Sequence, residues 1–386
     1  MKIFKVKYKP TLQAEEIQIN DWHFVTEVGI YNPSFVDSWD VIIPENAAFI
    51  SDSGKEFIDK LGENIVIDCV SSDYPLCFDS YNKIFETFTN KNIKVLSPNL
   101  LLYGEDNHYF IDPKMKQMEF IFKNSILFDE LAKIQSKFLR NKKYLFLTNH
   151  IRFERVEMLS HLYHCNNIED GLVGFPSIEK VSDEELQMVN HIGEHREKIR
   201  LVEDVDFGLP YNLDFFRPDN YETNQKHLLW NGTEWFNSSL HTGDFNLVLY
   251  LNAYFEMFSE TYFYGFGSVD TFIKNKDIPQ YIQVSEKTLK PIINLLPFLC
   301  LTDAGYYKKL KQMGLKFESK FYQDLSWDDL RSGSEKMLTF NEYIAFILSH
   351  SKNTLHEWYY TSLDEIIHNK HIFIRKMNNE IKRFLK

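Results

Sequence analysis

The segment 254–298 carries the densest set of side chains that could bind an anion. A strand-like stretch leads to the acid Glu260, and Glu286, Lys287 and Lys290 stand at the start of a predicted helix. A lysine in the first helical turn opposes the helix dipole by roughly a few tenths of a kcal/mol. A bound anion would offset that cost, because Lys287 and the backbone N–H groups could share a phosphate while Glu286 accepts ribose hydroxyls. The alternative is a surface helix start with solvated charges.

A second cationic segment follows another predicted strand. Asn149 ends that strand, and Arg152 and Arg155 come at the loop or helix start. An arginine at the carboxyl end of a strand is well placed to clamp a diphosphate with two parallel hydrogen bonds. The alternative is a solvated helix face on which the arginines pair with Glu154 or Glu157.

One motif suggests a different chemistry. His191, Glu194 and His195 match HxxEH, the zinc-binding pattern of one class of metallopeptidases. Gly193 weakens the helix that both ligands need, by about 1 kcal/mol relative to alanine. The surroundings are charged and no third ligand is evident. We therefore expect no metal site and keep a zinc metallopeptidase as the alternative from another class.

Helices and strands alternate in a way that predicts parallel sheets. Strands separated by helices of 10–15 residues favour βαβ units. In such sheets, ligands bind beyond the carboxyl ends of the strands, near helix N-termini. The predicted strands are 2–8, 39–43, 64–69, 93–96, 143–149, 246–255 and 297–302, and the predicted helices are 81–90, 115–140, 153–164, 285–296, 305–314 and 339–386.

Length, charge and cysteine usage limit the class of protein. A chain of 386 residues exceeds the usual size of one hydrophobic core, so we expect two α/β lobes that meet near 135–142. The net charge of −12 disfavours a protein that coats nucleic acid, although the basic stretches 137–143, 308–320 and 375–386 leave a local groove open. No GxGxxG or GxxxxGK[ST] follows a strand, which argues against NAD, FAD and a P-loop.

The cellular compartment can also be predicted from the sequence. No run reaches the roughly 18 apolar residues of a membrane span, and the first residues lack the apolar region of a signal peptide. The cysteines are scattered without metal spacing and predict reduced thiols: Cys69, Cys77, Cys165 and Cys300. We therefore expect a cytoplasmic protein, in the host cytoplasm if a phage encodes it.

The anion-binding segments carry a resemblance to a known family. A strand that ends in asparagine, a helix with arginine and a later [ST]EK segment resemble the catalytic domain of α1,3-fucosyltransferase-type glycosyltransferases. More closely, VSEKTLKPIINLLPFLCL followed by YYKKLKQMGLKF resembles uncharacterised phage and bacterial proteins classed as glycosyltransferases. The resemblance covers about residues 143–160 and 245–317, and EKTxKP is its most specific part.

The resemblance implies a GT-B fold with two Rossmann-like lobes. Residues 1–135 would form the acceptor lobe and 143–355 the donor-binding lobe, with the helix in 356–386 packed across both. Family residues would carry over to four positions: Arg155 and Lys287 on the diphosphate, Glu286 on the ribose and Glu260 near the donor sugar.

The expected reaction is metal-independent transfer of a sugar from a nucleotide sugar to a hydroxyl, with no other cofactor. Arginine and lysine can stabilise the leaving diphosphate in place of a metal. An inverting enzyme also needs a general base, and Asp68 and Asp73 follow a predicted strand of the first lobe. Each could equally be a loop-capping aspartate. We expect a glycan acceptor; a hydroxymethylated or glycosylated base in phage DNA is the alternative.

Overall fold

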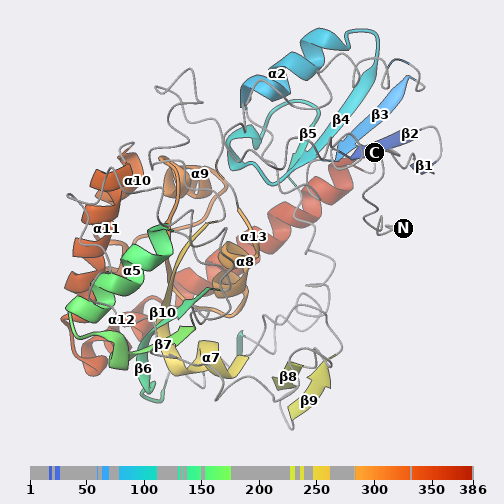
Figure 1. Ribbon diagram of the computed structural model, residues 1–386. Helices are drawn as coiled ribbons and strands as arrows, with labels where there is room; N and C mark the ends of the chain where they lie inside the picture. Colours follow the sequence, from blue (N-terminus) through green and yellow to red (C-terminus); the bar gives the residue numbers. More distant parts are fainter. Residues whose placement is uncertain are drawn as a thin grey trace. The chain divides into compact units, whose positions relative to one another are not determined.

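The protein is described by a computed structural model in which the chain divides into two compact units, each described here by itself (Figure 1). Unit 1 comprises Met1–Pro113, Gly267–Val284 and Arg375–Lys386, and unit 2 comprises Lys114–Phe266 and Ser285–Ile374. The structure describes residues 17–19, 22–26, 59, 63–68, 78–110, 129–130, 133, 137–148, 153–174, 227–230, 235–238, 247–260, 282, 284–330 and 333–384. Mixed α/β architecture with parallel sheets is confirmed.

Unit 1 contains a five-stranded sheet in the order β1-β2-β3-β4-β5. Its strands are β1 (Ile17–Ile19), β2 (Trp22–Thr26), β3 (Asn64–Asp68), β4 (Asn92–Ser97) and β5 (His108–Phe110). Strands β2 to β5 are parallel, and β1 is antiparallel to β2. The strands expected at 64–69 and 93–96 are thus present, whereas those expected at 2–8 and 39–43 lie outside the described residues.

Helices cover both faces of this sheet. Helix α2 (Phe78–Thr87) places Tyr81 against the buried ring of His108 on β5. On the other face, Val66, Leu96 and Tyr109 form a cluster against Phe384, near the end of α13 (Leu363–Phe384). The Lys94 ammonium donates to the backbone carbonyl of Phe384 (2.9 Å), so a cation caps the carboxyl end of the helix.

Unit 2 contains a four-stranded, fully parallel sheet in the order β11-β10-β6-β7. Its strands are β6 (Lys142–Leu147), β7 (Gly171–Gly174), β10 (Ala253–Ser259) and β11 (Phe298–Leu301). Every residue of β10 is buried, as expected of a central parallel strand covered on both faces. A separate hairpin pairs β8 (His227–Trp230) with β9 (Trp235–Ser238).

The helices of unit 2 lie on both sides of the sheet (Figure 1). Successive strand residues point to opposite faces. Ser259 contacts helix α5 and Glu260 contacts helix α8, so these two helices cover opposite faces. The helices are α5 (Phe153–His164), α7 (Leu247–Asn252), α8 (Glu286–Ile293), α9 (Tyr306–Gln312), α10 (Ser326–Asp329), α11 (Gly333–Leu348), α12 (Lys352–Thr361) and the first part of α13.

Two predicted elements in unit 2 differ from the structure. The helix expected over 115–140 does not reach its end, because residues 137–140 form a turn and an irregular segment. The run 246–255 was expected to be a single strand, but it forms α7 and then enters β10 at Ala253. A continuous apolar run fits a buried helix as well as a buried strand, so periodicity cannot separate them. The buried Arg140 marks the boundary, because its guanidinium donates to the carbonyls of Tyr250 (2.8 Å) and Ala253.

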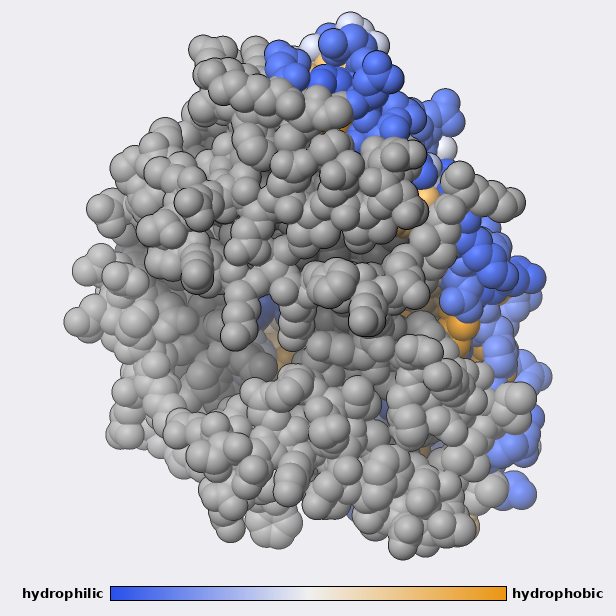
Figure 2. Space-filling view, turned by 90° about the vertical axis from the view of Figure 1, so that its right-hand side faces the viewer, coloured by the Kyte–Doolittle hydropathy of each residue, from blue (hydrophilic) through white to orange (hydrophobic). Residues whose placement is uncertain are grey.

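Large apolar side chains are rarely exposed in the described part of the chain. Those that are exposed are Phe138, Leu139, Leu338, Phe346 and Tyr360. On the face drawn in Figure 2, the described residues are mainly hydrophilic, with hydrophobic surface only in small gaps. Within the described residues, no helix has the length and apolar character needed to cross a membrane.

Candidate functional site

The order of the strands in unit 2 marks the carboxyl ends of its strands as a candidate ligand site. Across the sheet from β7 to β11, its four strands are the second, first, third and fourth in the sequence. The direction of winding therefore reverses between β6 and β10. At such a switch point, the loops after the two strands diverge to opposite faces and leave a crevice at their carboxyl ends. The described strands of unit 1 follow chain order without a reversal. The topological rule therefore favours unit 2 as the ligand-binding unit.

Arg155 bridges the two strands at this switch point. Its Nε donates to Ser259 Oγ at the end of β10 (3.1 Å), and its Nη1 donates to Thr148 Oγ1 just after β6 (3.0 Å). Ser259 donates in turn to Glu154 Oε1 (3.1 Å), which lies 3.8 Å from Arg155 Nε. All four residues are buried; Arg155 is 3% exposed. The guanidinium is thus held rigidly, and Glu154 balances its charge.

Glu260, on the other face of β10, fastens the start of α8. It is fully buried. Its Oε1 accepts the backbone N–H of Ser285 (3.1 Å) and the Thr288 hydroxyl (2.5 Å), and its Oε2 accepts the Ser285 hydroxyl (2.6 Å). Ser285 is the N-cap, and its Oγ accepts the N–H of Lys287. An internal carboxylate therefore occupies the place beside the helix start where we expected an external anion.

The proton positions in this cluster follow from its donors. Thr288 has one hydroxyl hydrogen, which it donates to Glu260, so the Tyr306 hydroxyl is the donor in its 2.5 Å contact with Thr288. Burial raises the pKa of Tyr306 far above its usual value, which keeps that hydrogen in place. The chain Tyr306–Thr288–Glu260 thus links helices α9 and α8 to the end of β10. Lys287 and Lys290 stand on the helix that this chain fixes, both partly exposed.

A third set of polar side chains, which follows β11 in the sequence, was not predicted from the sequence. Lys336, in the first turn of α11, is 1% exposed, and its Nζ donates to the carbonyl of Asp328 (3.4 Å). Burial lowers the pKa of Lys336, and the carboxylates of Asp328 and Asp303 counter that effect. Within the described residues, the buried Thr302 Oγ1 has no hydrogen-bond partner. The sequence feature that could have identified this set is Lys336 in the first turn of its helix, the same feature as Lys287 in α8.

Glu157, one turn after Glu154 on α5, is 4% exposed, and its buried Oε1 has no hydrogen-bond partner among the described residues. Burial raises its pKa from 4.5 to about 8. Because the folded state binds this proton more tightly than the unfolded state, Glu157 contributes stability that is fully present below pH 4.5 and is lost as the pH rises through 8. We expect Glu157→Gln to abolish this loss, which is on the order of 3 kcal/mol. Urea unfolding at pH 5.0, 6.5 and 8.0 measures it.

The matched control is Glu342→Gln, because Glu342 is exposed on α11. It should show the same dependence of unfolding free energy on pH as the wild type. Equal slopes for Glu157→Gln and the wild type would refute the assignment.

Several predicted site residues lie outside this description. Asn149, Arg152 and Asp73 are not among the described residues, and neither is the HxxEH motif of His191, Glu194 and His195. Asp68 ends β3 and Glu286 begins α8, but only their backbones are described. Among the described residues, no group of three or more His, Cys, Asp or Glu could hold a metal ion. Of the cysteines, Cys165 and Cys300 are free thiols.

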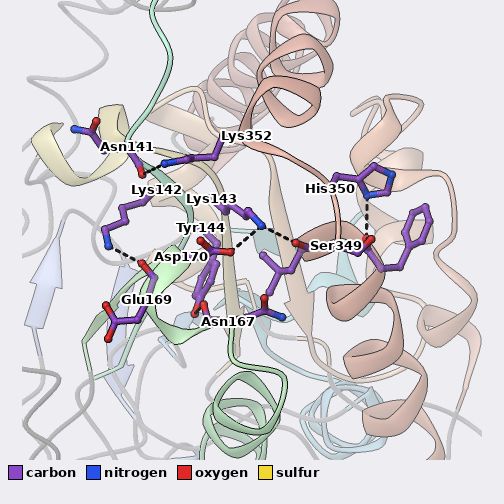
Figure 3. A network of polar contacts seen from close by, with 12 residues as sticks. Asn141, Lys142, Lys143, Tyr144, Asn167, Glu169, Asp170, Ser349, His350 and Lys352 are labelled. Carbon is purple, nitrogen blue, oxygen red and sulfur yellow. Dashed lines mark hydrogen bonds and ion pairs between the residues drawn. The ribbon is translucent and has the colours of Figure 1, made fainter.

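In the basic stretch 137–143, Lys142 and Lys143 have structural roles at the amino end of β6, the end away from the switch point (Figure 3). Lys143 Nζ donates to the carbonyl of Leu348, the last residue of α11 (2.8 Å), and pairs with Asp170 (2.7 Å). Lys142 Nζ donates to the carbonyl of Glu169 (2.7 Å). These lysines therefore close a helix end and a turn at the amino end of β6.

Comparisons with known proteins add no further evidence. No protein-family model, curated protein or solved structure matches the chain. The functional argument therefore rests on the geometry of unit 2 and on the chemistry of its side chains.

Proposed function

We propose that the chain is a metal-independent GT-B glycosyltransferase that moves a sugar from a nucleotide sugar to a hydroxyl of a glycan acceptor. Unit 2 would bind the donor and unit 1 the acceptor. The observation that carries this proposal is the winding reversal between β6 and β10, with Arg155 held across it by Ser259 and Thr148. Each unit also has its own sheet with parallel strands, β2 to β5 in unit 1 and all four strands in unit 2, which is compatible with a GT-B fold.

The site chemistry suits a diphosphate leaving group. Negative charge develops on the diphosphate as the glycosidic bond breaks, and fixed cations stabilise it. Lys287 and Lys290 stand on a helix that Glu260 clamps to the edge of the sheet. In this proposal, Glu260 positions α8 and does not touch the donor sugar, because it is fully buried. Asp68 and Asp73, at and after the end of β3, are the proposed candidates for the general base.

Nucleotide binding tests the proposal directly. We expect one of UDP, GDP, CMP, dTDP and ADP to raise the unfolding temperature, and to do so equally with and without EDTA. A ligand that binds only the folded state adds about 2.7 kcal/mol to the free energy of unfolding when its concentration is 100 times its dissociation constant. Lys287→Ala should weaken that nucleotide about tenfold, since one charge-assisted contact is lost. Thermal shift titration measures both effects.

Lys311→Ala is the matched control, because Lys311 is exposed on α9. It should bind the nucleotide like the wild type. The proposal fails if no nucleotide raises the unfolding temperature, or if Lys287→Ala binds as tightly as Lys311→Ala.

A further inference from the structure

A cysteine and a histidine lie together at the carboxyl end of helix α5. Cys165 Sγ is 3.7 Å from His161 Nε2. The helix follows the carboxyl end of β6 and leads back to the amino end of β7, which is parallel to β6. The pair is therefore at the amino edge of the sheet, and the switch point is at the carboxyl edge.

The backbone holds Cys165 one turn after His161. The Cys165 N–H donates to the carbonyl of His161 (3.0 Å), so helical hydrogen bonding continues to this residue. Asn166 then adopts a left-handed conformation (φ 53°), and the Asn167 N–H donates to the carbonyl of Leu162 (2.9 Å). These two features form a Schellman cap, which ends a helix at a defined residue. Residues four apart on a helix lie on one face, so the cap keeps the thiol beside the imidazole.

The separation of the two side chains matches the ligand spacing of a tetrahedral metal ion. Zinc binds thiolate sulfur at about 2.3 Å and imidazole nitrogen at about 2.0–2.1 Å. At the tetrahedral angle of about 109°, these bonds place sulfur and nitrogen about 3.6 Å apart. The distance from Cys165 Sγ to His161 Nε2 is 3.7 Å. One ion can therefore bind both atoms with little movement of either side chain.

The surroundings of the pair suit a cation from solvent. Cys165 is exposed and His161 is partly exposed. The carboxyl end of a helix carries partial negative charge, which favours a bound cation. Thiolate and imidazole are ligands for zinc and similar borderline-soft divalent ions, whereas magnesium and calcium prefer oxygen ligands. The chemistry of the two ligands therefore selects zinc over the hard cations.

Two protein ligands make an open site. Among the described residues, no third His, Cys, Asp or Glu joins the pair. A tetrahedral ion bound here keeps two positions for water. Such a site differs from a closed structural zinc site, in which four protein ligands surround the ion.

We propose that Cys165 and His161 form a surface chelate for one zinc ion per chain. The Cys165 thiol loses its proton to solvent as the bond from sulfur to zinc forms, and neutral His161 binds through the lone pair of Nε2. The site goes beyond the proposed transferase activity and does not rest on it.

Calorimetric titration of the full chain with Zn²⁺, after a chelator has removed adventitious metal, tests the site. We expect one binding event per chain that both Cys165→Ser and His161→Gln weaken at least tenfold. The matched control is His350→Gln, because His350 is also partly exposed but packs against aromatic rings. A second control, His195→Ala, changes the HxxEH motif. Both controls should bind zinc like the wild type.

Cobalt distinguishes sulfur ligation from binding elsewhere on the chain. Co²⁺ bound in place of zinc should give a thiolate-to-metal charge-transfer band in the near ultraviolet, and Cys165→Ser should remove it. Metal-free variants with the unfolding temperature of the wild type verify that all of them are folded.

Three results would overturn the proposal. The first is no zinc binding by the wild type. The second is equal zinc affinity in the wild type and in Cys165→Ser, or loss of binding in His195→Ala alone, which would place the ion at the HxxEH motif. The third is one zinc ion per two chains, which would show that a second copy completes the site in place of water.

Discussion

Replacing Arg155 with methionine is expected to lower the free energy of unfolding of unit 2 by about 3–5 kcal/mol. The guanidinium is 3% exposed and is the partner of the buried Glu154 carboxylate. Its removal leaves that carboxylate without its neighbouring cation and takes a donor from Ser259 and Thr148. Unfolding in guanidinium chloride without nucleotide measures the loss. A reduction of this size lowers the unfolding temperature by at least about 6 °C.

Two further variants distinguish charge from geometry at this position. Arg155→Lys keeps the charge but cannot bond to both Ser259 and Thr148 through one planar group, so we expect an intermediate loss. Adding Glu154→Gln to Arg155→Met should recover part of the stability, because it removes the buried charge. Arg375→Met, at an exposed arginine of α13, is the control. A loss below about 1 kcal/mol for Arg155→Met would contradict the buried network.

Glu260→Ala is expected to cost about 3–5 kcal/mol, because three donors of α8 lose their acceptor and the side chain leaves a cavity. The donors are the Ser285 N–H and the hydroxyls of Ser285 and Thr288. Glu260→Gln should cost less, about 1–3 kcal/mol, since one amide oxygen still accepts. Chemical unfolding of both variants measures these differences.

A double-mutant cycle of Glu260→Gln with Thr288→Val isolates the contact between the two side chains. We expect a coupling of at least about 1 kcal/mol, because the residues share one hydrogen-bond network. Tyr306→Phe serves as a milder comparison, as it removes only the outer donor of the chain. Additive effects of the Glu260 and Thr288 changes would show that the cluster does not act as a unit.

Local patterns predicted individual elements well. Helix α5 has the predicted bounds, 153–164, because its apolar residues recur at helical spacing. Ser285 marks the start of α8, since a serine before EKT is a typical N-cap. The run 246–255 failed because continuous apolar residues have no period to distinguish helix from strand.

The side-chain partners of the site could not be predicted in this way. Arg155 was expected to contact a diphosphate, and no local pattern predicted its bond to Ser259, 104 residues away in the sequence. Glu260 was expected near a donor sugar, and no local pattern predicted its bonds to the helix start 25 residues later. Such long-range pairs depend on how strands and helices assemble, and no local spacing records them. The strand order that identifies the switch point has the same origin.

The interleaving of the two units has a consequence for synthesis of the chain. Unit 1 begins with residues up to 113 but also needs residues from 375 onward, where Glu380 accepts the N–H of Phe110 (3.3 Å). At about 5–20 residues per second, a ribosome adds the intervening residues in roughly 13–50 s. During that interval, Phe384 is not yet present to pack against Val66, Leu96 and Tyr109. The first unit to emerge must therefore wait for a much later segment, and a chaperone has time to bind it meanwhile.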